Sequence, residues 1–477
     1  MRVERRYITF QYLILIFIKI KSMEINYQNQ KFQKLYGFFE KIENRINPGV
    51  LLLVVALITI IIANSSWHEG YESIWKTKLF FGTENFNLFS VHGHPFTTLE
   101  FVNDALMVIF FFSVGLEIKR EILVGELSSF RQAILPIIAA CGGMIVPVLV
   151  FFSIGKLQGF SPDELKGMAI PMATDIAFSL GVLSLLGKRV PLSLKIFLLA
   201  LATVDDIGGI AVIAIFYSQF TTASFIYLII SAILFGVLLI GNRLRINSKM
   251  FYAVVGIAIW YLFLQAGIHP TIAGVLVAFT IPARPHINVK IFTQGLQHDL
   301  DTIRKTILPE GEENRVLSNK QINYLTRIES ASDKVISPLQ GFENSLSNPV
   351  TYFIMPLFAF ANAGVVFEAS SLNLFTGIPF AVMMGLVIGK LVGIFSFTWL
   401  SVKFRIGRLS AGMTWKNILA LSLLGGIGFT VALFLGGLSY PLGSEMLNQA
   451  KSGVIVGSIF SGIMGYVLLR LVLKKKK

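Results

Sequence analysis

Two adjacent carboxylates, Asp205 and Asp206, stand in the centre of a long apolar run. The run from Leu192 to Tyr217 contains no other charged residue except Lys195 near its start. A helix of this length crosses a membrane, which places the pair near the middle of the bilayer. Ionisable groups at that depth cost about 2.5 kcal/mol or more each and usually mark an ion or proton path. The alternative is a structural pair neutralised by a basic neighbour.

A second polar group lies in the segment Ile170-Pro-Met-Ala-Thr-Asp-Ile-Ala-Phe178. Pro171 removes a backbone donor, and Thr174 and Asp175 put polar side chains at membrane depth. The pattern predicts a broken helix, whose freed backbone groups need a polar cavity.

A buried lysine completes the set of candidate residues. Lys390 lies near the centre of the apolar segment 376–400, too deep to reach water with its ammonium group. It needs a negative partner, and the buried acids are Asp175, Asp205 and Asp206. A purely structural salt bridge is the alternative to a role in transport.

Neighbouring residues on a helix point about 100° apart, so Asp205 and Asp206 do not face one point equally. One of them can line a water-filled cavity while the other faces Lys390 or Asp175. Burial and nearby acids oppose a nearby lysine in setting the pKa of a carboxyl group. A carboxylate balanced in this way holds either a proton or a small cation such as Na⁺, which prefers oxygen ligands. Competition between a proton and a cation for one site is the minimum that an exchanger requires.

A glycine-rich stretch, Leu424-Gly-Gly-Ile-Gly-Phe-Thr430, interrupts another apolar segment. Gly425, Gly426 and Gly428 each weaken a helix by about 1 kcal/mol relative to alanine. They predict a second broken helix. The alternative is close helix packing through small residues.

The composition is that of a polytopic membrane protein. Of 477 residues, 54% are hydrophobic and 14% are charged, and the mean hydropathy is +0.70. The net charge of +14 comes from short basic clusters between apolar runs, which fits membrane topology better than nucleic-acid binding. The single cysteine, Cys141, excludes an internal disulfide and any site built from several cysteines.

The expected fold is all-α, with twelve transmembrane helices. The apolar segments lie at about 49–65, 99–117, 133–153, 168–186, 192–217, 222–241, 250–264, 268–282, 349–366, 376–400, 417–437 and 451–473. The seventh and eighth could form one bent helix, but the glycine and proline between them favour two. The fourth and eleventh are the predicted broken helices.

Basic residues gather in alternate loops, which predicts cytoplasmic N- and C-termini. Residues 1–48 form a cytoplasmic N-terminal segment, and 1–22 are expected to come from an early start before Met23. Residues 49–473 form the transmembrane domain. It carries an external loop at 66–98 with a possible β-hairpin and a cytoplasmic insertion at 283–348, and 474–477 form a basic tail. The insertion 283–348 is partly helical in pattern around Leu296 to Ile307, and the alternative is a tethered, mobile insertion.

The assembled residues resemble the NhaA-type sodium/proton antiporter family over about residues 35 to 473. The segments that carry the resemblance are Val114-Gly-Leu-Glu-Ile-Lys-Arg-Glu121, Ala173-Thr-Asp-Ile-Ala-Phe178, Asp205–Asp206, Pro356-Leu-Phe-Ala-Phe-Ala-Asn-Ala-Gly364, Gly389-Lys390 and Gly425-Gly-Ile-Gly-Phe-Thr430.

The resemblance implies a secondary transporter of the bacterial inner membrane, not an enzyme. It would exchange cytoplasmic Na⁺ or Li⁺ for external protons electrogenically, by alternating access, for sodium and pH homeostasis. It implies two inverted-topology repeats, segments 3–5 and 10–12. The loop 66–98 resembles the family's dimer contact and suggests a homodimer. No cofactor is expected.

The resemblance also implies roles for single residues. Asp206 is the principal carboxylate for cation and proton, with Asp205 as its partner and Thr174 at the helix crossing. Asp175 offsets the positive ends of the half-helices and Lys390 the negative ends. The residues that match the family's pH-sensing region are Glu117, Lys119, Arg120, Glu121 and Glu343.

Two other functions are less compatible with these residues. An intramembrane aspartyl protease needs two facing carboxylates, and here they are neighbours on one helix. A passive cation channel needs a selectivity filter, which the sequence does not contain, and buried Lys390 would oppose cation flow.

Overall fold

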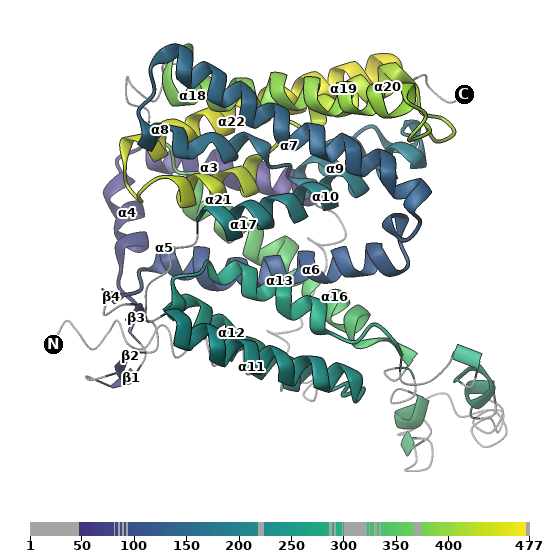
Figure 1. Cartoon of the computed structure of the whole chain (residues 1–477). Coiled ribbons are helices and arrows are strands. Elements are labelled where there is room, and N and C mark those ends of the chain that lie inside the picture. Colours follow the sequence, from purple (N-terminus) through teal and green to yellow (C-terminus); the bar gives the residue numbers. More distant parts are fainter. Residues whose placement is uncertain are drawn as a thin grey trace, which may run out of the picture. The chain divides into compact units, whose positions relative to one another are not determined.

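The computed structural model describes residues 47–80, 82–83, 86–87, 90–91, 94–217, 224–285, 289–290, 292–297, 299, 322–323, 325–328, 332, 335–366 and 374–473 (Figure 1). The expectations for residues 1–46, for much of the insertion and for the tail 474–477 lie outside them. Residues Pro48–Lys477 belong to one compact unit.

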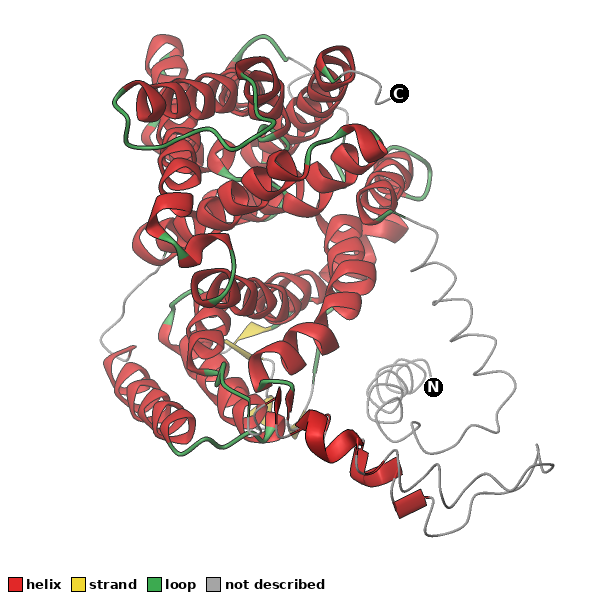
Figure 2. Cartoon of the chain, turned by 90° about the vertical axis from the view of Figure 1, so that its right-hand side faces the viewer, coloured by secondary structure: helices red, strands yellow, loops and turns green. Residues whose placement is uncertain are grey.

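The described chain is built almost wholly from helices (Figure 2). In chain order the helical elements are α3 (Pro48–Ala63), α4 (His68–Lys76), α5 (Thr98–Phe101), η3 (Val102–Leu106), α6 (Met107–Leu123), η4 (Glu126–Ser128), α7 (Phe130–Gln158), α8 (Pro162–Leu165), η5 (Lys166–Met172), α9 (Ile176–Ser184), η6 (Gly187–Arg189), α10 (Leu192–Phe216), α11 (Ser224–Arg243), α12 (Lys249–Ala266), α13 (Pro270–Thr280), α16 (Pro338–Pro349), η7 (Val350–Ile354), α17 (Met355–Asn362), α18 (Gly377–Met384), η8 (Gly385–Gly389), α19 (Lys390–Lys403), α20 (Trp415–Leu424), α21 (Phe429–Ser439) and α22 (Glu445–Val472).

Many of these helices are long and apolar enough to cross a membrane. Seven qualify singly within the described residues, and up to ten if each bent helix pair counts as one span. The bent pairs are α3 with α4, α8–η5 with α9, and α20 with α21. The chain is therefore a multi-pass membrane protein. The expected number of twelve stays a prediction, because it also requires the shorter α13 and η7–α17 as spans.

The helices fall into two neighbouring groups. Helices α7, α18, α19, α20 and α22 pack against one another in the upper part of Figure 1. Helices α6, α11, α12 and α13 pack together in the lower part. Apolar helices of a membrane protein associate through close packing rather than water exclusion, so the small residues at these contacts matter.

Helices α7 and α19 approach closely at a point where two glycines face each other. A Cβ atom on Gly393 would come within 2.2 Å of the Gly142 carbonyl oxygen, and one on Gly142 within 2.3 Å of the Gly393 oxygen. Only glycine allows the two backbones to approach this closely. The contact holds the helix that begins with Lys390 against α7.

The loop between α4 and α5 contains two short antiparallel strand pairs. Strand β1 (Gly82–Thr83) pairs with β2 (Phe86–Asn87), and β3 (Ser90–Val91) pairs with β4 (His94–Pro95). An isolated bridge joins Lys78 to Thr97 at the base of the loop. The strand content is thus local and leaves the all-helical architecture unchanged.

Two helix boundaries are set by residues at the edges of the apolar segments. Helices α12 and α13 are separate, because Gly267 ends α12 in the left-handed conformation with φ 74°. Helix α16 begins at Pro338, well before the apolar segment at 349–366, and continues through η7 into α17. Ser337 caps α16 by accepting a hydrogen bond from the Gln340 amide, so a polar helical turn precedes the span.

We expect Gly393→Ala to destabilise the fold by about 1–3 kcal/mol, because the new methyl group would overlap the Gly142 backbone. The thermal unfolding midpoint of the purified protein measures this. Gly236→Ala in α11 is the control, because a Cβ atom there meets nothing within 4 Å. The close-contact model is wrong if both variants unfold at the same temperature.

Candidate functional site

Two interrupted helices meet at the centre of the compact unit. Helices α8–η5 and α9 are bent by 43° around Ala173–Asp175, and α20 and α21 by 47° around Gly425–Gly428. The backbone of Ala173 and Asp175 is extended. The Asp175 amide donates a hydrogen bond of 2.7 Å to the Ile427 carbonyl oxygen. Each break therefore satisfies part of the other's exposed backbone.

Asp175 lies at the positive ends of two half-helices. Its Oδ1 accepts a hydrogen bond of 2.9 Å from the Phe178 amide and caps α9. Its Oδ2 accepts bonds from the Thr430 amide at 3.1 Å and from Thr430 Oγ1 at 2.6 Å, at the start of α21. One buried carboxylate thus satisfies donors of both helices and lies where both dipoles favour negative charge.

The negative end of α20 is satisfied by hydroxyl groups from the other broken helix. Ser179 Oγ donates a hydrogen bond of 3.1 Å to the Leu424 carbonyl oxygen. Thr174 Oγ1 lies 2.9 Å from the Gly425 carbonyl oxygen and 2.7 Å from Asp205 Oδ2. A hydroxyl has one proton, so Thr174 donates to one of these acceptors at a time.

Lys390 and Asp205 form a fully buried ion pair. Lys390 Nζ lies 2.6 Å from Asp205 Oδ2, and the side chains of both residues are 0% exposed. Nζ also donates a hydrogen bond of 2.9 Å to Thr174 Oγ1. The other carboxylate oxygen, Asp205 Oδ1, has no hydrogen-bond partner among the residues that the structure describes. The pair carries no net charge, and one strong acceptor atom is left unsatisfied.

Asp206 faces a different environment from its neighbour. It lines a cavity of about 150 Å³ together with Glu117, Thr174, Asp175 and Thr430. The carboxylate of Asp206 accepts no hydrogen bond from any residue that the structure describes. An acid in a small polar cavity, with its oxygens free, has room for a proton or a desolvated cation.

The helix-breaking residues occupy different parts of the crossing. Pro171 is buried inside η5, one residue before that helix ends at Met172. The three glycines lie between α20 and α21. A Cβ atom on Gly426 would come within 2.4 Å of the Leu386 carbonyl oxygen, and one on Gly428 within 3.0 Å of the Ala173 carbonyl oxygen. The glycines therefore both break the helix and allow close packing, because α20 ends there and neighbouring backbones approach them closely.

The five residues matched to pH sensing do not form one group. Arg120 lies 2.9 Å from Glu121 Oε1 and 2.9 Å from Glu343 Oε1. Burial raises the pKa of the Glu343 carboxyl group, and the Arg120 charge opposes this. Lys119 donates to the Phe279 and Ile281 carbonyl oxygens at the end of α13, whereas Glu117 lines the Asp206 cavity.

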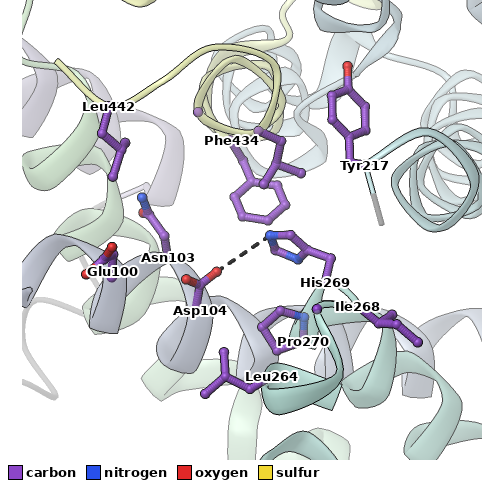
Figure 3. A pocket seen from close by; sticks show the side chains of 13 residues that line it. Glu100, Asn103, Asp104, Tyr217, Leu264, Ile268, His269, Pro270, Phe434 and Leu442 are labelled. Atoms are coloured by element: carbon purple, nitrogen blue, oxygen red, sulfur yellow. Dashed lines mark ion pairs between the residues drawn. The ribbon is translucent and has the colours of Figure 1, made fainter. Parts of the chain in front are cut away.

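A second cavity of about 290 Å³ contains Asp104 and His269 (Figure 3). The side chains form an ion pair when His269 is protonated, with His269 Nε2 3.5 Å from Asp104 Oδ1. Glu100, Asn103 and Tyr217 also line this cavity. It lies toward the end of the bundle that carries the outer loop, because η3 and the end of α10 supply its walls.

Buried aromatic side chains pack around Phe434, on the helix that contributes residues to both cavities. Helix α21 contributes Thr430 and Val431 to the Asp206 cavity and Phe434 to the Asp104 cavity. The Phe434 ring lies 5.4 Å from Phe111 and 6.2 Å from Phe358, centre to centre. It also lies 5.3 Å from the His269 ring. We call Phe111, Phe358 and Phe434 the aromatic septum.

Sequence reasoning did not assign a role to several residues at this site. Thr430 and Ser179 complete the backbone connections of the crossing, and Phe434 is the centre of the septum. A threonine directly after a glycine-rich break was a usable signal for Thr430. The sequence contained no comparable signal for Phe434, because it is one of 41 phenylalanines and is not distinguished by its residue type.

Comparison with known proteins gives a consistent result. The family model described as Na⁺/H⁺ antiporter 1 matches residues 40–469. A protein of Phocaeicola vulgatus named Na(+)/H(+) antiporter NhaA is 50% identical over 463 residues, which is 96% of this chain and 99% of the relative. Proteins of the same name from Bacteroides fragilis and Porphyromonas gingivalis are 52% and 45% identical, over 91% and 92% of this chain and 97% of each relative.

We expect Lys390→Met to lower the free energy of unfolding by about 3–5 kcal/mol, because it leaves Asp205 buried and unpaired. The double variant Lys390→Met/Asp205→Asn should recover part of this loss. Thermal unfolding of both single variants and the double variant measures the coupling. Strictly additive losses would show that the two side chains do not stabilise each other.

Proposed function

Because the chain belongs to the Na⁺/H⁺ antiporter 1 family, we propose that it exchanges Na⁺ for protons across a membrane at Asp206. The chain is a multi-pass membrane transporter and not an enzyme. The exchanged ions are cargo, and the proposed cycle uses no resident cofactor.

The environment of Asp206 is the observation that carries the assignment of the site. Asp206 lines a cavity with Asp175 and Thr174 at the crossing of two broken helices, and its oxygens are free of hydrogen bonds from the described residues. A deprotonated Asp206 binds Na⁺ through carboxylate oxygen, and a protonated Asp206 does not. Competition between the two ions for one carboxylate couples their movements.

Electrogenic exchange requires more protons than sodium ions in each cycle. The Asp205–Lys390 pair is the ionisable unit next to Asp206, and its Nζ–Oδ2 distance is 2.6 Å. Within the described part of the chain Asp205 Oδ1 lacks a hydrogen-bond partner. In the proposed cycle it supplies a second oxygen for the cation. A proton carried by this pair in addition to that of Asp206 makes the exchange sensitive to membrane potential.

Alternating access is supported by the unequal cavities. The Asp206 cavity is also lined by Glu117 and Ser347, and Glu117 lies within one turn of Arg120 near the end of α6. The aromatic septum separates it from the Asp104 cavity. Rearrangement of the septum would expose Asp206 to the other side. In the proposed cycle the two helix groups move relative to each other, with the inverted repeats 133–217 and 376–473 in one group.

The remaining expectations belong to the same proposal. The protein lies in the bacterial inner membrane as a homodimer, with both termini in the cytoplasm, and also carries Li⁺. The ion pairs of Arg120 with Glu121 and Glu343 couple transport to cytoplasmic pH. Glu117 connects this region to the ion site, because it lines the Asp206 cavity.

Proteoliposomes test the exchange directly. Addition of Na⁺ to vesicles loaded with a pH-sensitive dye should move protons in the opposite direction, and an imposed potential should change the rate. The proposal fails if Na⁺ moves no protons at any pH from mildly acidic to alkaline. A rate independent of potential would contradict electrogenic exchange alone.

We expect Asp206→Asn to reduce Na⁺-dependent proton movement to the level of empty vesicles, because the amide neither binds the cation by charge nor exchanges the proton. Asp163→Asn is the matched control, because that acid pairs with Lys166 on the exposed surface. Full turnover of Asp206→Asn would remove this residue from the central role.

We expect Phe434→Ala to open a leak through the septum, measured as Na⁺ uptake without a matching proton movement. Truncating a buried phenylalanine lowers the free energy of unfolding by about 3–5 kcal/mol. The control Phe151→Ala has the same kind of stability loss, but at a site away from both cavities. Phe151 is 0% exposed in α7 and does not line either cavity. Tight coupling in folded Phe434→Ala would exclude the septum as the barrier.

A further inference from the structure

A basic hollow lies where α19 ends and α20 begins, at a distance along the chain from the ion site. Its volume is about 480 Å³, and it is lined by Val402, Arg405, Gly407, Arg408, Leu409 and Trp415. We propose that this α19–α20 hollow binds the phosphate group of an anionic phospholipid, whose acyl chains lie along α19. The inference does not rest on the proposed transport function.

The two arginines of the hollow have no acidic partner. Arg405 and Arg408 are both exposed, and neither forms an ion pair with an acid in the described part of the chain. A guanidinium group presents paired donors that match two oxygens of a phosphate. Two such groups at one hollow favour an anion with several oxygens.

Arg405 has a backbone conformation that is unfavourable for residues other than glycine. The amides of Ile406 and Gly407 both donate to the Ser401 carbonyl oxygen, at 2.9 and 3.2 Å, and so close the end of α19. This closure puts Arg405 in the left-handed conformation with φ 60°. Glycine is favoured at such a position, so the turn itself does not require an arginine side chain. Arg245, after α11, adopts the same conformation with φ 58°.

The border of the hollow is apolar, which favours a lipid over a soluble phosphate. Trp399, Phe404 and Ile406 are 42%, 67% and 55% exposed. Val392, Phe395, Trp399 and Val402 share one face of α19 at helical spacing, and the Trp415 ring lies 6.0 Å from Phe395. A soluble anion needs no such surface, whereas acyl chains would cover it.

The position of the hollow fits the membrane interface. Lys403 Nζ lies 4.5 Å from the centre of the Trp399 ring, and Lys416 follows Trp415 at the start of α20. Tryptophan and lysine are typical of the level of the lipid headgroups. Clustered basic residues beside a membrane helix attract anionic lipids.

Thermal unfolding of the full chain in detergent tests the proposal. Phosphatidylglycerol should raise the unfolding midpoint of the wild type, and phosphatidylcholine with the same acyl chains should not. Arg405→Gly/Arg408→Gln should lose this rise, with apparent lipid affinity lowered by about tenfold for each arginine. Without lipid the variant should unfold no earlier than the wild type, because glycine suits the left-handed turn.

Arg131→Gln/Arg470→Gln is the matched control, because it removes two exposed arginines outside the hollow. It should keep the response to phosphatidylglycerol. Inorganic phosphate alone should give no shift. The proposal is overturned by an undiminished lipid response of the Arg405/Arg408 variant, by an equal loss in the control, by a wild type that does not respond, or by an equal shift with phosphate alone.

Discussion

Opening two helices inside an apolar bundle leaves backbone groups that no water can satisfy, and the site is arranged around this constraint. Every unpaired amide or carbonyl at such depth costs several kcal/mol, so each break needs partners from elsewhere in the fold. The two breaks supply partners to each other, through the Asp175 amide and the Ile427 carbonyl oxygen. Asp175 then satisfies the amide ends, and the Thr174 and Ser179 hydroxyl groups lie at the carbonyl ends.

The buried charged side chains lie near the ends of the broken helices. The amide ends of α9 and α21 carry positive dipole charge and face the Asp175 carboxylate, and the buried Lys390 reaches Thr174, which contacts the end of α20. Lys390 also pairs with Asp205, which leaves Asp206 as the acid that faces the cavity. Two chemically identical neighbours thereby acquire different environments, which is the physical basis for the roles proposed for them.

Two cavities lined by different residues lie at or near the site. Asp206 lines one cavity and Asp104 the other, and α21 contributes residues to both, with Phe434 packed against Phe111. The proposal makes these rings the barrier between the two cavities. The aromatic septum consists of rings from α21, α6 and α17. In the proposed cycle it therefore stays closed only while the broken helix α21 keeps its position against α6 and α17. Glu117 and Arg120 lie on the same helix, α6, within one turn of each other. A movement of α6 would therefore displace both the proposed pH-responsive ion pairs and the wall of the Asp206 cavity.

The amino-acid sequence by itself determined the membrane class, the family resemblance and the polar residues of the site. These follow from local properties: charged groups are rare in apolar segments, so Asp175, Asp205, Asp206 and Lys390 stand out by type alone. Proline and the glycines marked the breaks for the same reason, because they remove hydrogen bonds or weaken a helix locally.

Only the tertiary structure decided which acid pairs with Lys390. Asp205 and Asp206 differ by about 100° on α10, and nothing in their order along the chain says which direction faces α19. That choice depends on how α10 and α19 are placed relative to each other in the fold, where Lys390 meets Asp205. The aromatic septum likewise required the fold, because a phenylalanine becomes a barrier only through the cavities on its two sides.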